Sequence, residues 1–455
     1  MRYLPLTEKD RKEMMIKVAV NSVDSLFTSI PENYKITEGI GLSEALMESE
    51  LLSKLERLSN KNKTFDDIKA FIGAGIYNHY IPVAVDHIIS RSEFYTAYTP
   101  YQPEISQGTL QAIFEFQTLI SQLFDMEITN ASMYDGATSL VEAILMAKRV
   151  NRKNKAVISS AIHPEYRETL TTYFANEEYL EIPISEEGIT DIDDLISEIN
   201  PETTAVVIQY PNFLGNIEDL PKIRKIMDEN APKALLIVVV AEALSMGLLT
   251  PPGTFGADVV VGEGQSLGLT PSFGGPGIGL FSCKAKYLRK MPGRIAGETV
   301  DKDGEKAFVF TISTREQHIR REKATSNICS NHSLNAVAVA VYLSLMGKEG
   351  IREVALSNFY NTQYAIKILS QFPSIFKIKY GKKVFNEFVI EFNDEIDVEL
   401  FYDKLFKEKN ILLGLPLKKF YPEESKSLLL NFTEQTSTKD IDDFTKNIIE
   451  VIGEL

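Results

Sequence analysis

Residues 256–279, GADVVVGEGQSLGLTPSFGGPGIG, have the form of an active-site loop without an obvious reactive group. The stretch begins as an apolar strand and then breaks into a glycine-rich polar loop. In an open α/β sheet, ligands bind beyond the carboxyl end of such a strand. Yet the loop has no lysine, histidine, cysteine or arginine, and no lysine occurs between Lys233 and Lys284. Any proposed chemistry has to explain that gap.

A second candidate is the junction YDGATS at residues 134–139, which precedes an apolar helical pattern. The exposed N–H groups and the positive end of a helix make such a junction a possible anion site. The residues that would form it are Gly136, Ala137, Thr138 and Ser139. The alternative is an ordinary capped helix start, because Ser139 and Glu142 fit a capping box.

Two polar side chains follow predicted strands and could hold a ligand. His163 lies between a strand and a helix, a good position for stacking on a ring. Asn212 lies in a Pro-Asn turn, where its amide can both donate and accept. The alternative for His163 is a histidine whose hydrogen bonds are made within the chain or with solvent. The alternative for Asn212 is a simple turn. None of the five histidines pairs with another histidine, cysteine or acid at metal-ligand spacing, so we expect no metal site.

Two further segments are unusual in composition. Residues 93–104, EFYTAYTPYQPE, place three tyrosines in a loop, and tyrosine suits interfaces and ligand mouths. A packed surface loop is the alternative. Residues 314–323 form a dense charge run that is typical of a solvated, internally paired helix. The small and polar residues at 324–329 that follow are unusual for a surface helix.

Composition excludes several classes of function. The chain has 455 residues, 44% of them hydrophobic, which is enough for a large core. A formal net charge of −15 disfavours nucleic acid and anionic membrane as partners. Two cysteines give no disulfide framework and indicate a reducing compartment. The first residues lack the apolar segment of a signal peptide, so we expect a cytoplasmic protein.

The hydrophobic pattern predicts an α/β architecture. Short apolar strands are expected at residues 156–159, 180–183, 205–209, 235–240 and 259–261, with amphipathic helices between them. This alternation favours a mostly parallel sheet. We divide the chain into an N-terminal helical segment (1–65), an irregular Tyr/Pro-rich arm (66–108), a large domain (109–347) and a small α+β domain (348–455).

Six stretches carry a resemblance to one known family. They are GAGIYNHYIP (73–82), SEFYTAYTPYQPEISQG (92–108), NASMYDGAT (130–138), 261–279, MPGRIAG (291–297) and STREQHIRREKATSNICS (313–330). Together they closely resemble the P-protein of the glycine cleavage system, the decarboxylating glycine dehydrogenase. The likeness is to its separate N-terminal-half subunit, subunit 1, and spans essentially the whole chain.

The resemblance implies a fold-type I pyridoxal phosphate (PLP) architecture. That fold has a seven-stranded, mostly parallel sheet flanked by helices and a small C-terminal α+β domain. In split P-proteins, subunit 2 carries the PLP-lysine in a His-Lys-Thr segment, and alignment places Gln265 at the histidine and Ser266 at the lysine. The strand at 235–240 also ends in Ala-Glu-Ala, without the expected Asp-x-Ala acid. Because serine cannot form an imine, we expect no covalently bound PLP in this chain.

The resemblance also implies partners and a reaction. Subunit 1 pairs with subunit 2, commonly as α2β2, and the pair decarboxylates glycine on PLP, releasing CO2. The aminomethyl group passes to the lipoyl arm of H-protein. The active site lies at the subunit interface, so the residues expected to serve the partner's pocket are Tyr95, Tyr98, Tyr101, Gln102, Ser326 and Asn327. The alternatives are a non-catalytic scaffold and a self-sufficient homodimeric PLP enzyme that uses Lys284 or Lys323.

Overall fold

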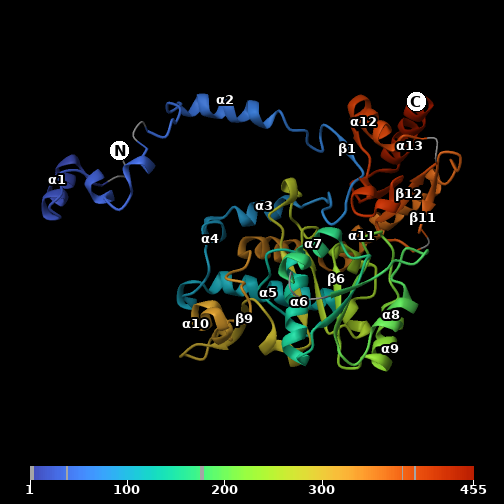
Figure 1. Cartoon of the computed structure of the whole chain (residues 1–455), viewed down its shortest axis with the longest axis horizontal. Coiled ribbons are helices and arrows are strands. Elements are labelled where there is room, and N and C mark those ends of the chain that lie inside the picture. Colours follow the sequence, from blue (N-terminus) through green and yellow to red (C-terminus); the bar gives the residue numbers. More distant parts are fainter. Residues whose placement is uncertain (1–4, 37–38, 175–178, 382, 394–395, 455) are drawn as a thin grey trace. The chain divides into compact units, whose positions relative to one another are not determined.

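The computed structural model describes residues 5–36, 39–174, 179–381, 383–393 and 396–454. By its contacts the chain forms two compact units, Met1–Thr64 and Phe65–Leu455 (Figure 1). The sheets and the cavities described below belong to the second unit. The four-part division predicted from the sequence stays a prediction.

The first unit contains the helices α1 (Glu8–Lys17) and α2 (Glu48–Ser59). Thr7 caps α1 by accepting a hydrogen bond from the backbone of Asp10, which fixes the start of that helix. Neither helix buries a residue. The apolar stripe of α2 lies exposed along the helix at Leu51, Leu52, Leu55 and Leu58. In the described part of this unit, the apolar side chains therefore stay at or near the surface.

A seven-stranded sheet forms the centre of the second unit, in the order β2-β8-β7-β6-β5-β3-β4. The strands are β2 (Ile128–Thr129), β3 (Lys155–Ser159), β4 (Tyr179–Ile182), β5 (Thr203–Gln209), β6 (Leu235–Val240), β7 (Val259–Glu263) and β8 (Gly279–Cys283). The five strands from β7 to β4 run parallel, and β8 pairs antiparallel with both β7 and β2. The predicted mostly parallel, seven-stranded sheet is therefore confirmed.

Helices cover both faces of this sheet, which explains why its strands are apolar on both sides. Alternate residues of β6 enter two different cores: Leu236 and Val238 lie in one, and Leu235 and Ile237 in the other. The covering helices are α5 (Gln107–Phe124), α6 (Gly136–Asn151), α7 (Pro164–Tyr173), α8 (Ile192–Glu198), α9 (Leu220–Asn230) and α11 (Ser333–Leu369). Although α11 is long and apolar enough to cross a bilayer, its first half packs in the core.

The C-terminal part is a second, antiparallel sheet of order β11-β12-β15-β14. Its strands are β11 (Phe376–Lys379), β12 (Glu387–Phe392), β14 (Leu415–Pro416) and β15 (Ser427–Asn431). The helices α12 (Val398–Lys409) and α13 (Thr438–Gly453) pack their apolar residues into its core. The strand β1 (Lys69–Ala70) pairs with β13 (Ile411–Leu412), which ties the start of the unit to this region.

Two segments differ from expectation. Residues 66–108 were expected to be irregular, but they contain α3 (Val83–Ile89) and α4 (Ser92–Tyr95). The charge run at 314–323 was expected to form one solvated helix. It contains only the short α10 (Gln317–Arg320) between 3-10 turns, because the Arg315 guanidinium is buried and donates to the carbonyl of Gly293. Just before it, β9 (Ile295–Val300) and β10 (Lys306–Thr311) form an antiparallel hairpin.

The close approach of β6 and β7 at their carboxyl ends depends on Gly262. A Cβ atom at this position would lie 1.9 Å from the carbonyl oxygen of Val240, so we expect Gly262→Ala to cost about 3 kcal/mol or more of unfolding free energy. Gly108→Ala is the matched control, because a Cβ there meets nothing within 4 Å. Urea denaturation of both variants tests this, and equal stability would contradict it.

Candidate functional site

A cavity of about 460 Å³ opens at the carboxyl edge of the parallel strands. Its wall is formed by the ends of β3 and β7, the start of α6 and a segment from the N-terminal side of the unit. The residues that line it are Ala74, Gly75, Ile76, Tyr134, Asp135, Gly136, Ala137, His163, Glu165, Tyr166, Thr169, Glu263, Gln265, Pro271, Gly274, Gly275, Pro276, Gly277 and His332. The predicted residues Gly136, Ala137, His163 and Gln265 are therefore brought together.

The N-terminus of α6 is already occupied by carboxylates of this chain. Asp135 is the N-cap and accepts a hydrogen bond from the backbone N–H of Thr138 at 2.7 Å. The N–H of Gly136 donates to Glu263 Oε2 at 3.1 Å. The predicted capping box of Ser139 with Glu142 is wrong, because the helix begins earlier and the Ser139 hydroxyl donates to the Asp135 carbonyl. An incoming anion would meet negative charge at this helix end.

Glu263 is a site residue that the sequence pattern did not single out. Its second oxygen accepts from the N–H of Ile278 at 2.7 Å. Burial raises the pKa of its carboxyl group to about 7, although hydrogen bonds from the backbone oppose the shift. An acid as the last residue of a buried strand was the only local signal. Its contact with Gly136 spans 127 residues and follows from the fold alone.

His163 is held as a neutral imidazole. Its Nδ1 accepts from the N–H of Glu165 at 3.2 Å, so Nε2 carries the proton and donates to the carbonyl of Ala74 at 2.8 Å. Burial lowers the pKa of the ring. The ring stacks on Tyr166 with centroids 4.8 Å apart. Across from it, a Cβ at Gly75 would lie 2.8 Å from Nε2. Both ring nitrogens are therefore hydrogen-bonded within this chain.

Residues 73–80, which we name the strap, run across the edge where a ligand would bind. Gln265 accepts from the N–H of Tyr77 at 2.8 Å and donates to the carbonyl of Tyr77 at 3.1 Å. Glu387, at the start of β12, accepts from the N–H of Ala74 at 2.6 Å and from the Tyr77 hydroxyl at 2.9 Å. Beside Gln265, Ser266 is buried, and its hydroxyl has no hydrogen-bond partner in the described part of the chain.

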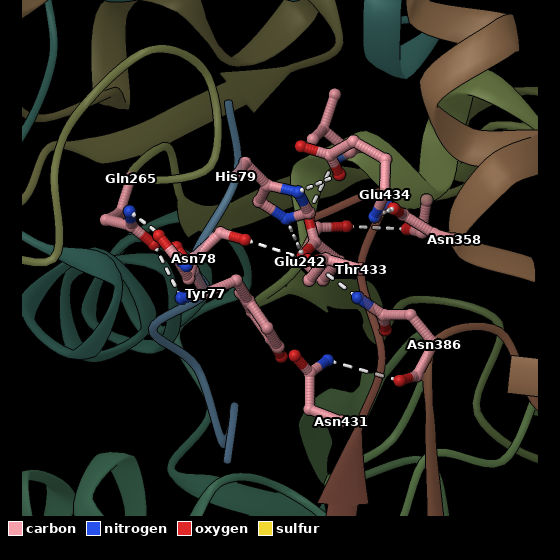
Figure 2. A network of polar contacts seen from close by, with 12 residues as sticks. Tyr77, Asn78, His79, Glu242, Gln265, Asn358, Asn386, Asn431, Thr433 and Glu434 are labelled. Carbon is pink, nitrogen blue, oxygen red and sulfur yellow. Dashed lines mark hydrogen bonds and ion pairs between the residues drawn. The ribbon is translucent and has the colours of Figure 1, made fainter. Parts of the chain in front are cut away.

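The end of the strap enters a buried network of ion pairs and hydrogen bonds (Figure 2). His79 Nε2 lies 3.0 Å from Glu242, which follows β6, and Nδ1 lies 2.8 Å from Glu434, which follows β15. Asn386 donates to the same Glu242 oxygen at 3.2 Å. The acid near the end of β6 is thus a glutamate that the chain's own histidine neutralises.

The charges in this network stabilise one another. Burial alone would lower the pKa of His79, but the facing carboxylates of Glu242 and Glu434 raise it to about 10. Burial would raise the pKa of Glu434, yet its contacts with His79 bring it below its usual value. The imidazole is therefore an imidazolium at neutral pH.

The tyrosine loop (residues 93–104) lies apart from these buried groups. Tyr95, Tyr98 and Gln102 are exposed. Tyr101 accepts a hydrogen bond from the Arg294 guanidinium, which also lies 4.8 Å above the Tyr101 ring. Tyr98 lines a separate cavity of about 300 Å³ with residues at the start of α11.

The other predicted site residues lie in different places. The Ser326 hydroxyl accepts from the N–H of Ile328, and Asn327 donates to the Tyr173 hydroxyl at 3.3 Å. Asn212 is buried in the turn after β5, where its side chain holds Glu218. It does not line the main cavity. The described ranges contain no group of three His, Cys, Asp or Glu residues that could hold a metal ion.

The sheet order and the position of the cavity define the chain as an α/β protein of the fold-type I PLP class. A sphingosine-1-phosphate lyase of Burkholderia pseudomallei K96243 shares this fold, with a TM-score of 0.67 at 14% identity over 92% of this chain and 93% of that chain. Residues 1–448 match the glycine cleavage system P-protein family, and the chain belongs to that family.

Particular relatives are similar along nearly their whole length. Proteins of Bacillus cereus (strain ATCC 10987 / NRS 248) and Bacillus thuringiensis (strain Al Hakam) are named probable glycine dehydrogenase (decarboxylating) subunit 1. Each is 46% identical over 443 residues, which cover 97% of both chains. A crystal structure of glycine decarboxylase (P-protein) of the glycine cleavage system, in inhibitor-bound form, is 39% identical with a TM-score of 0.89, covering 99% of this chain and 100% of that chain.

The residues at the carboxyl edge do not fit PLP, the cofactor implied by the fold. Glu263 faces the helix end that would bind a phosphate. The strap is hydrogen-bonded to His163 and Gln265. The acid after β6, Glu242, is engaged by His79. We therefore derive no chemistry through a cofactor at this edge.

The raised pKa of His79 predicts how stability depends on pH. The group is charged in the folded state up to about pH 10 and in the unfolded state only below about 6.5. Its contribution to the unfolding free energy is therefore complete below pH 6.5 and is lost as pH rises through 10. Truncating a buried ion pair costs about 3–5 kcal/mol, so His79→Gln should destabilise strongly at about pH 7.

The measurement is urea unfolding of wild type and His79→Gln at about pH 7 and about pH 10. The difference in unfolding free energy between the two proteins should be larger at the lower pH. A difference that stays constant, or that grows toward pH 10, would show that His79 is not charged in the folded protein.

Proposed function

We propose that this chain acts as subunit 1 of a two-subunit glycine decarboxylase of the glycine cleavage system. Its partner, subunit 2, binds PLP covalently, and the complex, as α2β2, decarboxylates glycine. The complex releases CO2 and passes the aminomethyl group to the lipoyl group of H-protein. This chain completes the interface and the partner's active site, and we expect the complex in the cytoplasm. The family membership and the names of the relatives support the proposal.

The observation that carries the proposal is how the polar groups of the carboxyl edge are bonded. The strap, Glu263 and Gln265 take the hydrogen bonds that a cofactor would need there. Ser266, at the position aligned with the PLP-lysine, is buried and has no group able to form an imine. A member of a catalytic family with such an edge needs a second chain to supply the cofactor.

Exposed apolar side chains support an extensive interface with that second chain. In the tyrosine loop, Tyr98 is 77% exposed, and nearby Ile105 is 80% exposed. At the tip of the loop after β7, Phe273 is 89% exposed. The first unit adds the apolar stripe of α2. Exposed apolar surface of this extent is typical of protein–protein interfaces.

The positions of Lys284 and Lys323 disfavour a self-sufficient enzyme. Lys284 donates to Asp258 at 2.8 Å and to the carbonyl of Gly256 at 3.1 Å. Both acceptors precede β7, so this lysine lies at the amino edge of the sheet, opposite the cavity. Lys323 is exposed in a 3-10 turn outside it. A purely structural subunit remains the second candidate, because the exposed tyrosines could serve assembly alone.

The visible spectrum of the purified chain with added PLP, alone and with subunit 2, tests the proposal. We expect the absorption of lysine-bound cofactor only when subunit 2 is present. Ser266→Lys should not restore that absorption in the chain alone, because Glu263 still faces the start of α6 and the strap still holds Gln265. Lysine-bound cofactor in the wild-type chain alone would overturn the proposal.

Substitutions in the tyrosine loop separate a contribution to the active site from a structural role. Tyr95→Phe and Tyr98→Phe keep the apolar ring and remove only the hydroxyl. We expect turnover of the reconstituted complex to fall about tenfold, with assembly intact. Tyr360→Phe, at an exposed position on α11, is a control for loss of a tyrosine hydroxyl elsewhere. Turnover equal to wild type in both loop variants would refute the assignment and leave the structural subunit.

A further inference from the structure

The strap leads directly into the tyrosine loop. It ends at Tyr80, three residues before α3, and α3 is followed by α4 and the loop. In the described part of the chain, the hydroxyls of Tyr95 and Tyr98 have no hydrogen-bond partner, so these side chains do not fix the loop. Its position therefore depends on attachments at its two ends and on α3, which packs Val85 into the core.

The far end of the loop is attached to the large domain. Tyr101 contacts the Arg294 guanidinium, and the Thr99 hydroxyl lies 3.2 Å from the hydroxyl of Ser330. In the described part of the chain, the near end makes only local polar contacts, the Arg91–Glu93 ion pair and the bond from the Thr96 hydroxyl to the Ser92 carbonyl. The next polar attachments toward the N-terminus are those of the strap, and the last buried side chain among them before α3 is His79.

We propose that His79 is a positioning residue: held as an imidazolium between Glu242 and Glu434, it fastens the base of the tyrosine loop, so that the loop meets the partner's active site in a fixed position. The inference deepens the proposed function and rests on it for the role of the partner. The attachment itself is a property of this chain alone.

The charge state follows from the geometry of the ring. Its two nitrogens lie 3.0 Å and 2.8 Å from oxygens of two different carboxylates, Glu242 and Glu434. A neutral imidazole has one donor and would leave a lone pair facing a carboxylate, whereas an imidazolium donates from both nitrogens. The other ionisable groups around the pair are Tyr77, Glu387 and Tyr342, all of which are neutral or negative.

The two carboxylates come from different sheets. Glu242 follows β6 of the large sheet and also accepts from the N–H of Leu244 and from Asn386. Glu434 follows β15 of the C-terminal sheet, and its own N–H donates to Asn358 on α11 at 2.6 Å. Figure 2 shows the imidazole between them. A single side chain thus joins the strap to both sheets.

Glu434 also holds the backbone of the strap. Its second oxygen accepts from the N–H of Tyr80 at 2.6 Å, and the neighbouring Thr433 hydroxyl donates to the carbonyl of Asn78 at 2.8 Å. The backbone on both sides of His79 is therefore fixed at the point where the chain leaves for α3. Loss of the ion pair should loosen this point and the chain that leaves it for α3, where Val85 is the next residue buried in the core.

Three variants separate positioning from simple stability. His79→Gln leaves two buried carboxylates without a cation. His79→Gln combined with Glu434→Gln restores the net charge of the wild-type cluster but not the bridge between the two sheets. Lys409→Gln, which breaks an exposed ion pair with Glu450, is the control for charge loss elsewhere. The double variant should regain part of the lost stability without regaining the loop's position.

The first measurement is amide hydrogen exchange of the isolated chain, which needs no partner. We expect His79→Gln and the double variant to raise exchange of residues 83–98 about tenfold or more, and Lys409→Gln to leave it unchanged. If the double variant recovers stability and wild-type protection together, His79 is only a stabilising charge and the inference fails. Unchanged exchange in both variants also overturns it.

Imidazole ¹⁵N NMR of the wild-type chain supplies a test that does not depend on the folding of any variant. Both His79 nitrogens should be protonated at about pH 8, above the ordinary histidine pKa. A single protonated nitrogen there would overturn the inference.

The reconstituted complex then tests the consequence for catalysis. The double variant should assemble but lose about tenfold in kcat, because a misplaced loop misaligns the groups it presents. Wild-type kcat in that assembled complex would overturn the role in positioning. If the wild-type complex has no glycine decarboxylase activity, the proposed function fails and this catalytic role fails with it, whereas raised exchange would still establish the attachment.

Discussion

The structure of the carboxyl edge depends on one constraint: buried carboxylates must find donors or cations, because leaving them unpaired costs several kcal/mol each. Four glutamates lie around this edge, and each is satisfied from within the chain. Glu263 takes the N–H of Gly136, and Glu387 takes the strap's backbone and a tyrosine hydroxyl. Glu242 and Glu434 share His79. The path of the strap follows from these pairings.

This constraint links the loss of a cofactor site to the presentation of a loop. Parallel strands direct their carboxyl ends to one edge, where polar groups and helix N-termini usually serve a ligand. Here the same groups bind residues 73–80, so the edge becomes an anchor. The chain that leaves this anchor carries Tyr95 and Tyr98 at the surface. The hydrogen bonds of the strap at the carboxyl edge therefore give a fixed starting point to the tyrosine loop, which we propose serves the partner's active site.

Local patterns in the sequence were enough for the five parallel strands of the sheet but not for β2, β8 or the site. The apolar run at 235–240 is β6 to the residue, because β-branched residues buried on both faces leave no alternative. His163 was singled out because it follows a predicted strand and Gln265 because of the family resemblance, and both line the cavity. The partners that neutralise the edge were missed, because the Tyr77–Glu387 contact joins positions 310 residues apart. His79 was considered only as a metal ligand, and its two acids lie beyond any spacing rule.

The same reasoning changes what the missing lysine means. The sequence alone places the difference at one residue, Ser266. In the structure, three further features separate this edge from a cofactor site: the start of α6, the ring of His163 and the path of the strap. Each of them is held by hydrogen bonds within the chain. A single substitution cannot reverse such an arrangement, because every polar group freed from the strap would need a new partner. The serine is therefore one part of an edge rebuilt around the chain itself.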